Sequence, residues 1–206
     1  MLKKIQQDSH DKFEALGYPS KKLENWKFSP SKHLKKYSSK NLDQSNFSIE
    51  KYSDKYTLCF INGELATESL NHFIYKDSIT ILDIGELEDN SICSTSSNFE
   101  KEAFFHLGLS TVKTGKYFEF HKGVKFENPI KIINIYNKSD KDLRISSFNI
   151  FKLNEGNDIS IIEKDINEGS GSFNLNLNKF ICPDNTILNH SMLYDDKTES
   201  NYLGYN

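Results

Sequence analysis

The residues best suited to metal chemistry are three cysteines, and they lack the spacing of a ligand group. Cys59 and Cys182 lie in apolar segments, Cys93 lies in a polar one, and no Cys-x-x-Cys occurs. A metal ion or iron–sulfur cluster needs several thiolates or imidazoles that converge on one point. We therefore interpret Cys59 and Cys182 as buried apolar residues, and Cys93 as an exposed thiol without a nearby cation.

The six histidines show no i, i+4 pair of the kind that forms a helical metal site. His106 lies in an apolar segment and is interpreted as a hydrogen-bonded core residue, whereas His121 is expected to face outward. A site shared by Cys182 and His190 is the strongest of the weak metal candidates. We predict no catalytic, cofactor-binding or metal-binding residue in this chain.

Charge and hydropathy exclude several classes of protein. The chain of 206 residues has a net charge of −3 and a single arginine, Arg144, so it lacks the basic stripe of a nucleic-acid-binding protein. The longest apolar run covers only residues 58–61, and no signal-peptide core is evident near the first residue. An odd number of cysteines fits a reducing compartment, and we expect the cytoplasm, or the stroma if the source carries plastids.

The elements expected in the first half are mixed. Residues 1–16 have the apolar spacing of an amphipathic helix that ends at Gly17, and a short helix is expected from Pro30 to residue 36. Strands are expected at 56–61 and 79–84, the first turning through Asn62-Gly63, which is a strong hairpin signal. An apolar helix is expected at 99–111.

The second half reads as short strands divided by tight turns. Strands are expected at 117–121, 130–136, 144–153, 158–163, 173–181 and 186–193. The order of an apolar residue, a turn, a polar residue and an isoleucine at residues 153–159 occurs again at residues 181–187, at a constant offset of 28. Short strands at regular spacing also occur in antiparallel sandwiches, but the repeat favours a β-solenoid.

Residues 16–30 read Leu-Gly-Tyr-Pro-Ser-Lys-Lys-Leu-Glu-Asn-Trp-Lys-Phe-Ser-Pro and contain the only tryptophan. This order resembles the N-terminal signature of SufD proteins, in the SufB/SufD family of iron–sulfur cluster assembly proteins. Similar matches follow at 60–65, 103–107, 123–133 and 153–163, and together they correspond to the N-terminal half of the family. The residues that carry the resemblance are Pro19, Lys21, Glu24, Trp26, Lys27, Pro30, Asn62, Gly63, Gly123, Pro129 and Gly156.

The resemblance implies an α+β fold with a small, mostly helical N-terminal domain (1–112) followed by the first turns of a right-handed parallel β-helix (113–206). It implies a non-catalytic scaffold subunit that binds SufB-like and SufC-like proteins, with the iron–sulfur cluster and ATP handled only by the full complex. For Trp26, anchoring of the N-terminal segment to the core is favoured over a role in partner binding.

Members of the family are roughly twice as long, so this chain reads as truncated or as a short form, and no residue of the later repeats can be carried over. An unfinished β-helix end would favour self-association through unpaired strands. The alternative function is that of a β-helical carbohydrate-active or adhesion protein.

Overall fold

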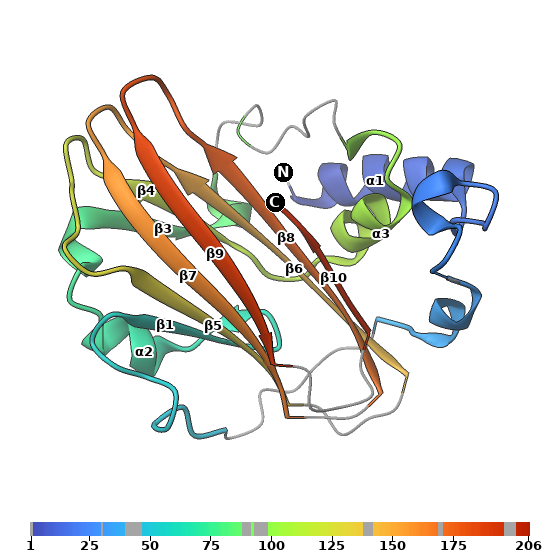
Figure 1. Cartoon of the computed structure of the whole chain (residues 1–206), viewed down its shortest axis with the longest axis horizontal. Helices are drawn as coiled ribbons and strands as arrows, with labels where there is room; N and C mark the ends of the chain where they lie inside the picture. The colour runs from blue at the N-terminus through green and yellow to red at the C-terminus, as the bar shows by residue number, and fades with distance from the viewer. Residues whose placement is uncertain are drawn as a thin grey trace.

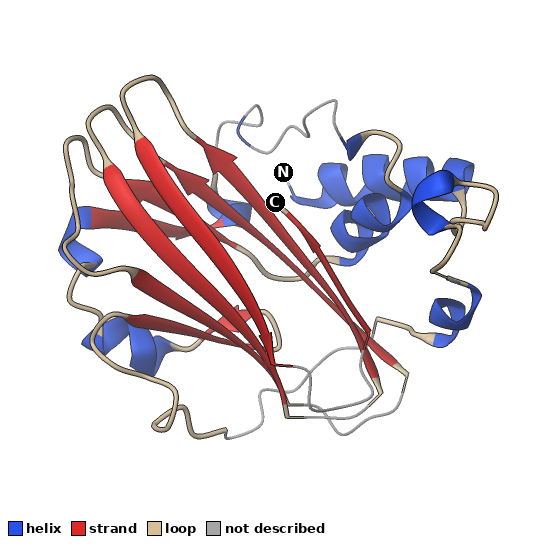
Figure 2. Cartoon of the chain, in the orientation of Figure 1, coloured by secondary structure: helices blue, strands red, loops and turns tan. Residues whose placement is uncertain are grey.

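Two five-stranded sheets packed face to face form the centre of the molecule, with helices on the outside (Figure 1, Figure 2). The structure, a computed structural model, describes residues 2–29, 31–39, 47–87, 92, 99–137, 142–168, 171–195 and 201–206. Aromatic and aliphatic side chains from both sheets fill the space between them, among them Phe60, Phe118, Ile132, Phe151 and Ile161.

The first sheet has the strand order β2-β1-β5-β7-β9 and the second β10-β8-β6-β4-β3. The strands of the first are β1 (Thr57–Ile61), β2 (Glu64–Leu65), β5 (Ile130–Tyr136), β7 (Asp158–Asn167) and β9 (Ile187–Asp195). Those of the second are β3 (Ile79–Asp83), β4 (Lys116–Phe120), β6 (Leu143–Lys152), β8 (Ser172–Ile181) and β10 (Asn201–Tyr205). The helices are α1 (Leu2–Leu16), α2 (Thr67–His72) and α3 (Ala103–Thr111), with 3-10 turns η1 (Glu24–Trp26), η2 (Lys32–Lys36), η3 (Lys76–Ser78) and η4 (Ile84–Glu86).

Successive strands from β4 onward alternate between the two sheets, and each strand from β6 onward pairs in parallel with the strand two before it. Lys152 pairs with Ile181 and Asp158 with Ile187, an offset of 29 residues, one more than the offset of the sequence repeat. The antiparallel strands β2 and β3 occupy one edge of each sheet.

This arrangement corrects the expected fold class. The right-handed parallel β-helix preceded by a mostly helical domain is wrong, because the chain forms a sandwich of two mixed sheets with helices outside. The first 112 residues are helical only in part, since they supply β1, β2 and β3 to the sheets. Regular turns and β-branched segments are common to both architectures, and the periodicity alone could not separate them. The domain boundary at 112/113 stays a prediction.

The outer face of the second sheet is covered by α1 and α3. Strand β8 alternates strictly, so that Phe173, Leu175 and Leu177 point to the helices while its asparagines point to the other sheet. Helix α3 is buried over Ala103–Leu109 because it lies between α1 and this sheet, as its apolar character on every side predicted. None of the described helices has both the length and the apolar character needed to span a membrane.

Local signals located several boundaries well. Helix α1 ends at Leu16, and Gly17 follows with φ 64° and its N–H bonded to the carbonyl of Phe13 (2.7 Å), as predicted. Asn62 (φ 49°) and Gly63 (φ 90°) make the hairpin turn between β1 and β2. Helix α2 was not predicted, and the short helix expected from Pro30 is the 3-10 turn η2.

Candidate functional site

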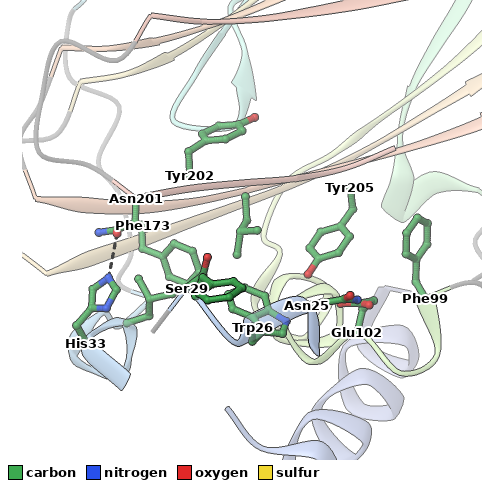
Figure 3. Close-up of a pocket in the computed structure, with 13 residues that line it drawn as sticks. Asn25, Trp26, Ser29, His33, Phe99, Glu102, Phe173, Asn201, Tyr202 and Tyr205 are labelled. Atoms are coloured by element: carbon green, nitrogen blue, oxygen red, sulfur yellow. Dashed lines mark hydrogen bonds between the residues drawn. The ribbon is translucent and has the colours of Figure 1, made fainter. Parts of the chain in front are cut away.

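An apolar groove of about 720 Å³ lies between residues 25–29 and 33–34, the segment that leads into α3, and strand β10 (Figure 3). Most of its walls are aromatic or aliphatic. Its lining residues are Asn25, Trp26, Phe28, Ser29, His33, Leu34, Phe99, Glu102, Phe173, Asn201, Tyr202, Leu203 and Tyr205.

The wall formed by residues 25–29 and 33–34 is held by local structure. After Gly17 the chain turns back, Pro19 becomes buried, and its carbonyl accepts a hydrogen bond from the hydroxyl of Ser31. That bond closes a loop that contains η1, and η2 begins directly after it. Because Ser31 is itself buried, the loop is fixed at its base while the side chains at its tip stay at the surface.

Trp26 belongs both to the core and to the groove. Its ring contacts Phe104 of α3 edge-on at 4.9 Å, and Phe104 in turn contacts Phe173 of β8 at 5.6 Å. The residue remains only half-buried, so the rest of its surface forms part of the groove wall. The expected anchoring role and a binding role are therefore compatible.

Phe28 is the most exposed large apolar side chain described, with 87% of its surface accessible. The ammonium of Lys27 lies 5.3 Å from the centre of its ring, within the range of a cation–π contact. A large aromatic ring left in water loses the stabilisation that its burial would give, so Phe28 is a candidate contact residue at the border of the groove.

Polar groups occur at the rim of the groove. His33 Nε2 donates to Asn201 Oδ1 (3.0 Å), and Asn201 Nδ2 donates to the hydroxyl of Tyr37 (3.0 Å), which ties η2 to β10. Tyr205 points into the groove, whereas Tyr202 points away from it (Figure 3). Burial raises the pKa of Tyr205 far above its usual range, so its hydroxyl stays protonated and can donate.

The composition of the groove fits binding. Aromatic and aliphatic walls with a few polar groups at the rim are typical of sites that receive the apolar side chains of a peptide or ligand. Phe99 and Tyr205, which contact each other at 5.6 Å, were not singled out in the sequence. Their separation by about a hundred residues left no local pattern to find them.

The residues of the family resemblance fall into two sets. Pro19, Lys21, Glu24, Trp26 and Lys27 lie together on the loop beside the groove, and all but Pro19 and Trp26 are exposed. Pro30 lies outside the described residues. The second set lies elsewhere, at turns and strand starts, and consists of Asn62, Gly63, Gly123, Pro129 and Gly156.

Most of the second set forms turns. Gly123 (φ 75°), Gly156 (φ 81°) and Asn185 (φ 60°) have left-handed backbone conformations in successive turns. The N–H of Gly123 bonds to the carbonyl of Glu155, and the N–H of Gly156 to that of Asn185, both at 3.0 Å. Left-handed φ explains the residue types here, so these positions need no partner to account for them.

The cysteines behave in two ways. Cys59 is fully buried, as predicted, and burial together with the charges of Asp54 and Glu68 raises its pKa to about 12, so its thiol is inert. The prediction for Cys182 is wrong, because it is exposed in the turn after β8. Cys93 lies outside the described residues. Among the residues that are described, no three His, Cys, Asp or Glu side chains gather as a metal ion would require.

The histidine predictions have definite outcomes. His106 is buried and its Nε2 donates to the carbonyl of Glu100 (3.1 Å), as predicted for a core histidine, and burial lowers its pKa. His121 is exposed, as expected. His190 turns inward, where its ring lies 4.8 Å from that of Phe180 and its Nε2 donates to Glu163, so it shares no site with the exposed Cys182.

Two buried carboxylates between the sheets were missed by the sequence analysis. Glu163 of β7 has 1% of its side chain exposed, and its four hydrogen bonds come from three amides and one imidazole. The donors are Asn134 (2.7 Å) and Asn176 (2.6 Å) to Oε1, and Asn178 (2.8 Å) and His190 (3.1 Å) to Oε2. Asn-x-Asn-x-Asn in β8 facing Glu-x-Asp in β7 is the signal that could have revealed it.

Asp165, two residues further along β7, is less well satisfied. Its Oδ1 accepts from Asn134 Nδ2 (2.6 Å), whereas its buried Oδ2 has no hydrogen bond of normal geometry. Burial and the charge of Glu163 raise the pKa of Asp165 to about 7, although Tyr202 and Asn134 partly oppose the rise. Both carboxylates are enclosed by protein and lie apart from the groove.

Comparison with known proteins adds no assignment: no protein-family model matches the chain, and no curated protein matches it either.

Proposed function

We propose that this chain is a SufD-like scaffold subunit of the Suf machinery for iron–sulfur cluster assembly, without catalytic activity of its own. In this role it binds SufB-like and SufC-like proteins, and cluster formation and ATP hydrolysis take place only in the assembled complex. The proposed compartment is the cytoplasm, or the stroma in a plastid-bearing cell.

The observation that carries the proposal is where the resemblance lies on the molecule. Lys21, Glu24, Lys27 and Phe28 are exposed, and Trp26 forms part of an open groove. The core therefore does not require the residue types of the four exposed positions. A surface whose sequence resembles that of a scaffold family, and which presents Trp and Phe in a groove, has the character of a protein-binding hot spot.

Direct binding to the proposed partners tests the role. The purified chain is titrated with the SufB-like and SufC-like proteins of the same organism, and complex formation is followed by isothermal titration calorimetry. We expect a complex with a Kd of about 1 μM or tighter for at least one of them. Binding to neither protein at about 100 μM, by a chain whose circular dichroism shows it to be folded, would refute the role.

A matched pair of variants locates the contact. Phe28→Ser removes an exposed groove residue, and Leu23→Ser removes another exposed apolar residue of the same loop that does not line the groove. Both leave the core untouched. The role predicts that Phe28→Ser weakens binding by about tenfold or more, while Leu23→Ser changes it less than about twofold.

A further inference from the structure

Positive charge is concentrated on the loop that builds the groove. Residues 20–36 contain six lysines and one glutamate, although the chain as a whole has a net charge of −3. Four of these lysines line a second hollow of about 700 Å³ next to the groove, formed with Tyr18, Pro19, Ser20 and Ser31. They are Lys21, Lys22, Lys32 and Lys35.

Most of these cations have no ion-pair partner among the residues that the structure describes. Of the six lysines only Lys36 forms an ion pair within the described part of the chain, with Asp142 at 2.9 Å. Lys27 and Lys35 lie over the rings of Phe28 and Tyr18, at 5.3 and 5.2 Å, and both are exposed. Exposed like charges held close together repel one another, and an acidic partner would relieve that repulsion.

The hollow and the groove adjoin through η2. His33 and Leu34 line the apolar groove, while Lys32 and Lys35 line the basic hollow. A ligand bound in the groove would therefore lie close to the lysines at the border of the groove. The two features form one surface, which we name the groove–lysine surface and define by Trp26, Phe28, Leu34, Lys32 and Lys35.

We propose that the groove–lysine surface docks an acidic, hydrophobic segment of a partner protein. Apolar side chains of the segment fill the groove beside Trp26 and Phe28, and flanking Asp or Glu residues meet the lysines. The inference rests on the proposed function only for the identity of the partner. It adds the chemistry by which that partner is recognised.

A peptide segment fits these observations better than nucleic acid. The lysines are point charges without the paired donors that hold phosphate in two bonds, and the only arginine, Arg144, is partly buried and donates to the carbonyl of Tyr37 (3.2 Å). The groove is lined mainly by aromatic and aliphatic side chains, and it is large enough to receive several apolar side chains of a peptide.

The position of Trp26 supplies a direct readout. Because it is the only tryptophan and lines the groove, its fluorescence reports occupancy without a label. The probes are tryptophan-free peptides of about 12 residues in which Leu and Phe alternate with Asp and Glu. One matched peptide has Lys in place of the acids, and another has Ser in place of the apolar residues.

The acidic, hydrophobic peptide is expected to shift Trp26 emission to shorter wavelength and to bind about tenfold more tightly than either matched peptide. Its affinity should fall about tenfold between about 50 and about 300 mM NaCl. No binding at about 1 mM, or equal binding of the lysine peptide, would overturn the proposal. Tighter binding of a single-stranded oligonucleotide or of anionic vesicles than of the acidic peptide would overturn it as well.

Charge-reversed variants test the lysines. Lys32→Glu with Lys35→Glu should weaken the acidic peptide by about tenfold or more and flatten its salt dependence. Lys3→Glu with Lys4→Glu, two exposed lysines of α1 outside the surface, should change it less than about twofold. Phe28→Ser tests the apolar part without touching the core. Unchanged affinity in both groove–lysine variants would refute the docking mode.

The two proposals fail separately. If acidic peptides bind as described but SufB-like and SufC-like proteins do not, the docking surface stands and the scaffold role is wrong. If those proteins bind with the same affinity to the Lys32→Glu, Lys35→Glu double variant, the role stands and the docking surface is wrong.

Discussion

Glu163 is a charge-bearing side chain placed where charge is costly, and its hydrogen bonds explain how the fold tolerates it. All four acceptor directions of the carboxylate are used, by Asn134, Asn176, Asn178 and His190. Removal of the acceptor would leave the Asn176 amide and the His190 imidazole without this partner, while Asn134 and Asn178 would keep only their bonds to Asp165 and Asn206. We expect Glu163→Ala to lower the free energy of unfolding by about 3–5 kcal/mol, measured by urea denaturation.

The test of Glu163→Ala needs a milder substitution at the same position and a control substitution at an exposed glutamate. Glu163→Gln keeps the shape and one acceptor oxygen but directs an NH₂ group at other donors, so it should be destabilised less than the alanine variant. Glu127→Ala, at an exposed position, should leave the unfolding midpoint unchanged. Equal midpoints for Glu163→Ala and the natural chain would contradict the network's role.

Asp165 makes stability depend on pH in a direction opposite to that of most carboxylates. Its pKa is raised from 3.8 to about 7 by burial and by Glu163, so the folded chain holds a proton that the unfolded chain releases. Stability from this group is therefore complete below about pH 4 and is lost as the pH rises towards 7. The chain should lose about 2–4 kcal/mol between these limits.

Asp165→Asn removes this titration. The asparagine keeps an acceptor for Asn134, and its NH₂ lies where the carboxylate oxygen without a hydrogen bond was. We expect the variant to be more stable than the natural chain at pH 8 and similar to it at pH 4, by urea denaturation at both values. Asp184→Asn, in an exposed turn, should keep the natural profile. An unaltered slope in Asp165→Asn would mean that other groups cause it.

Among the elements, the start of β4 has the tightest backbone contact described for a glycine. A Cβ atom at Gly115 would lie 1.9 Å from the carbonyl oxygen of Phe148 and 2.6 Å from Ile84 Cδ1. The first neighbour is backbone of β6, which cannot move without disturbing the parallel pair β4–β6. We expect Gly115→Ala to destabilise the fold by about 3 kcal/mol in thermal or urea denaturation.

Gly85 provides the matched control. It lies in η4, which leads towards the same region, but a Cβ there would meet no atom within 4 Å. Gly85→Ala should therefore be neutral or slightly stabilising, because alanine restricts the unfolded chain more than glycine does. A Gly115→Ala variant as stable as Gly85→Ala would show that β6 can shift to admit the methyl group.

The sequence could predict a helix end or a turn where a few neighbouring residues specify its backbone conformation. Gly17 and Asn62-Gly63 specify their backbone conformations within a few residues, so the end of α1 and the first hairpin were located correctly. Strand β8 shows the opposite case. Its alternation of Asn with Phe and Leu is typical of a strand with one solvent face, yet both faces are buried because a second sheet covers the asparagines.

Local sequence signals could not predict features that depend on contacts between residues far apart in the chain. The exposure of Cys182 and the inward turn of His190 depend on where each strand ends in the sheet, which composition does not specify. The groove is formed by residues as distant as Trp26 and Tyr205. The sequence did mark one of its walls, through the ordered segment from Pro19 to Trp26, because that wall is a single continuous loop.

For the whole molecule, β9 and β10 form the edges of the two sheets at one end of the sandwich, opposite the edges formed by β2 and β3 (Figure 1). Within the residues that the structure describes, each pairs with one strand only, β7 and β8 respectively. Strand β9 also carries exposed apolar side chains, with Ile187, Leu193 and Tyr194 each about half accessible. Edge strands with this character are prone to pair with another chain unless charge or cover prevents it.

We therefore expect the chain to self-associate as its concentration rises from about 5 to about 200 μM, measured by light scattering after size exclusion. Leu193→Lys places a charge on β9 and should shift the population towards monomer, since a lysine at an edge opposes strand pairing. Ile74→Lys, at another exposed apolar side chain outside the two edges, should leave the association unchanged. A monomer at every concentration would show that these edges are already protected, and association lost in Ile74→Lys instead would place the contact elsewhere.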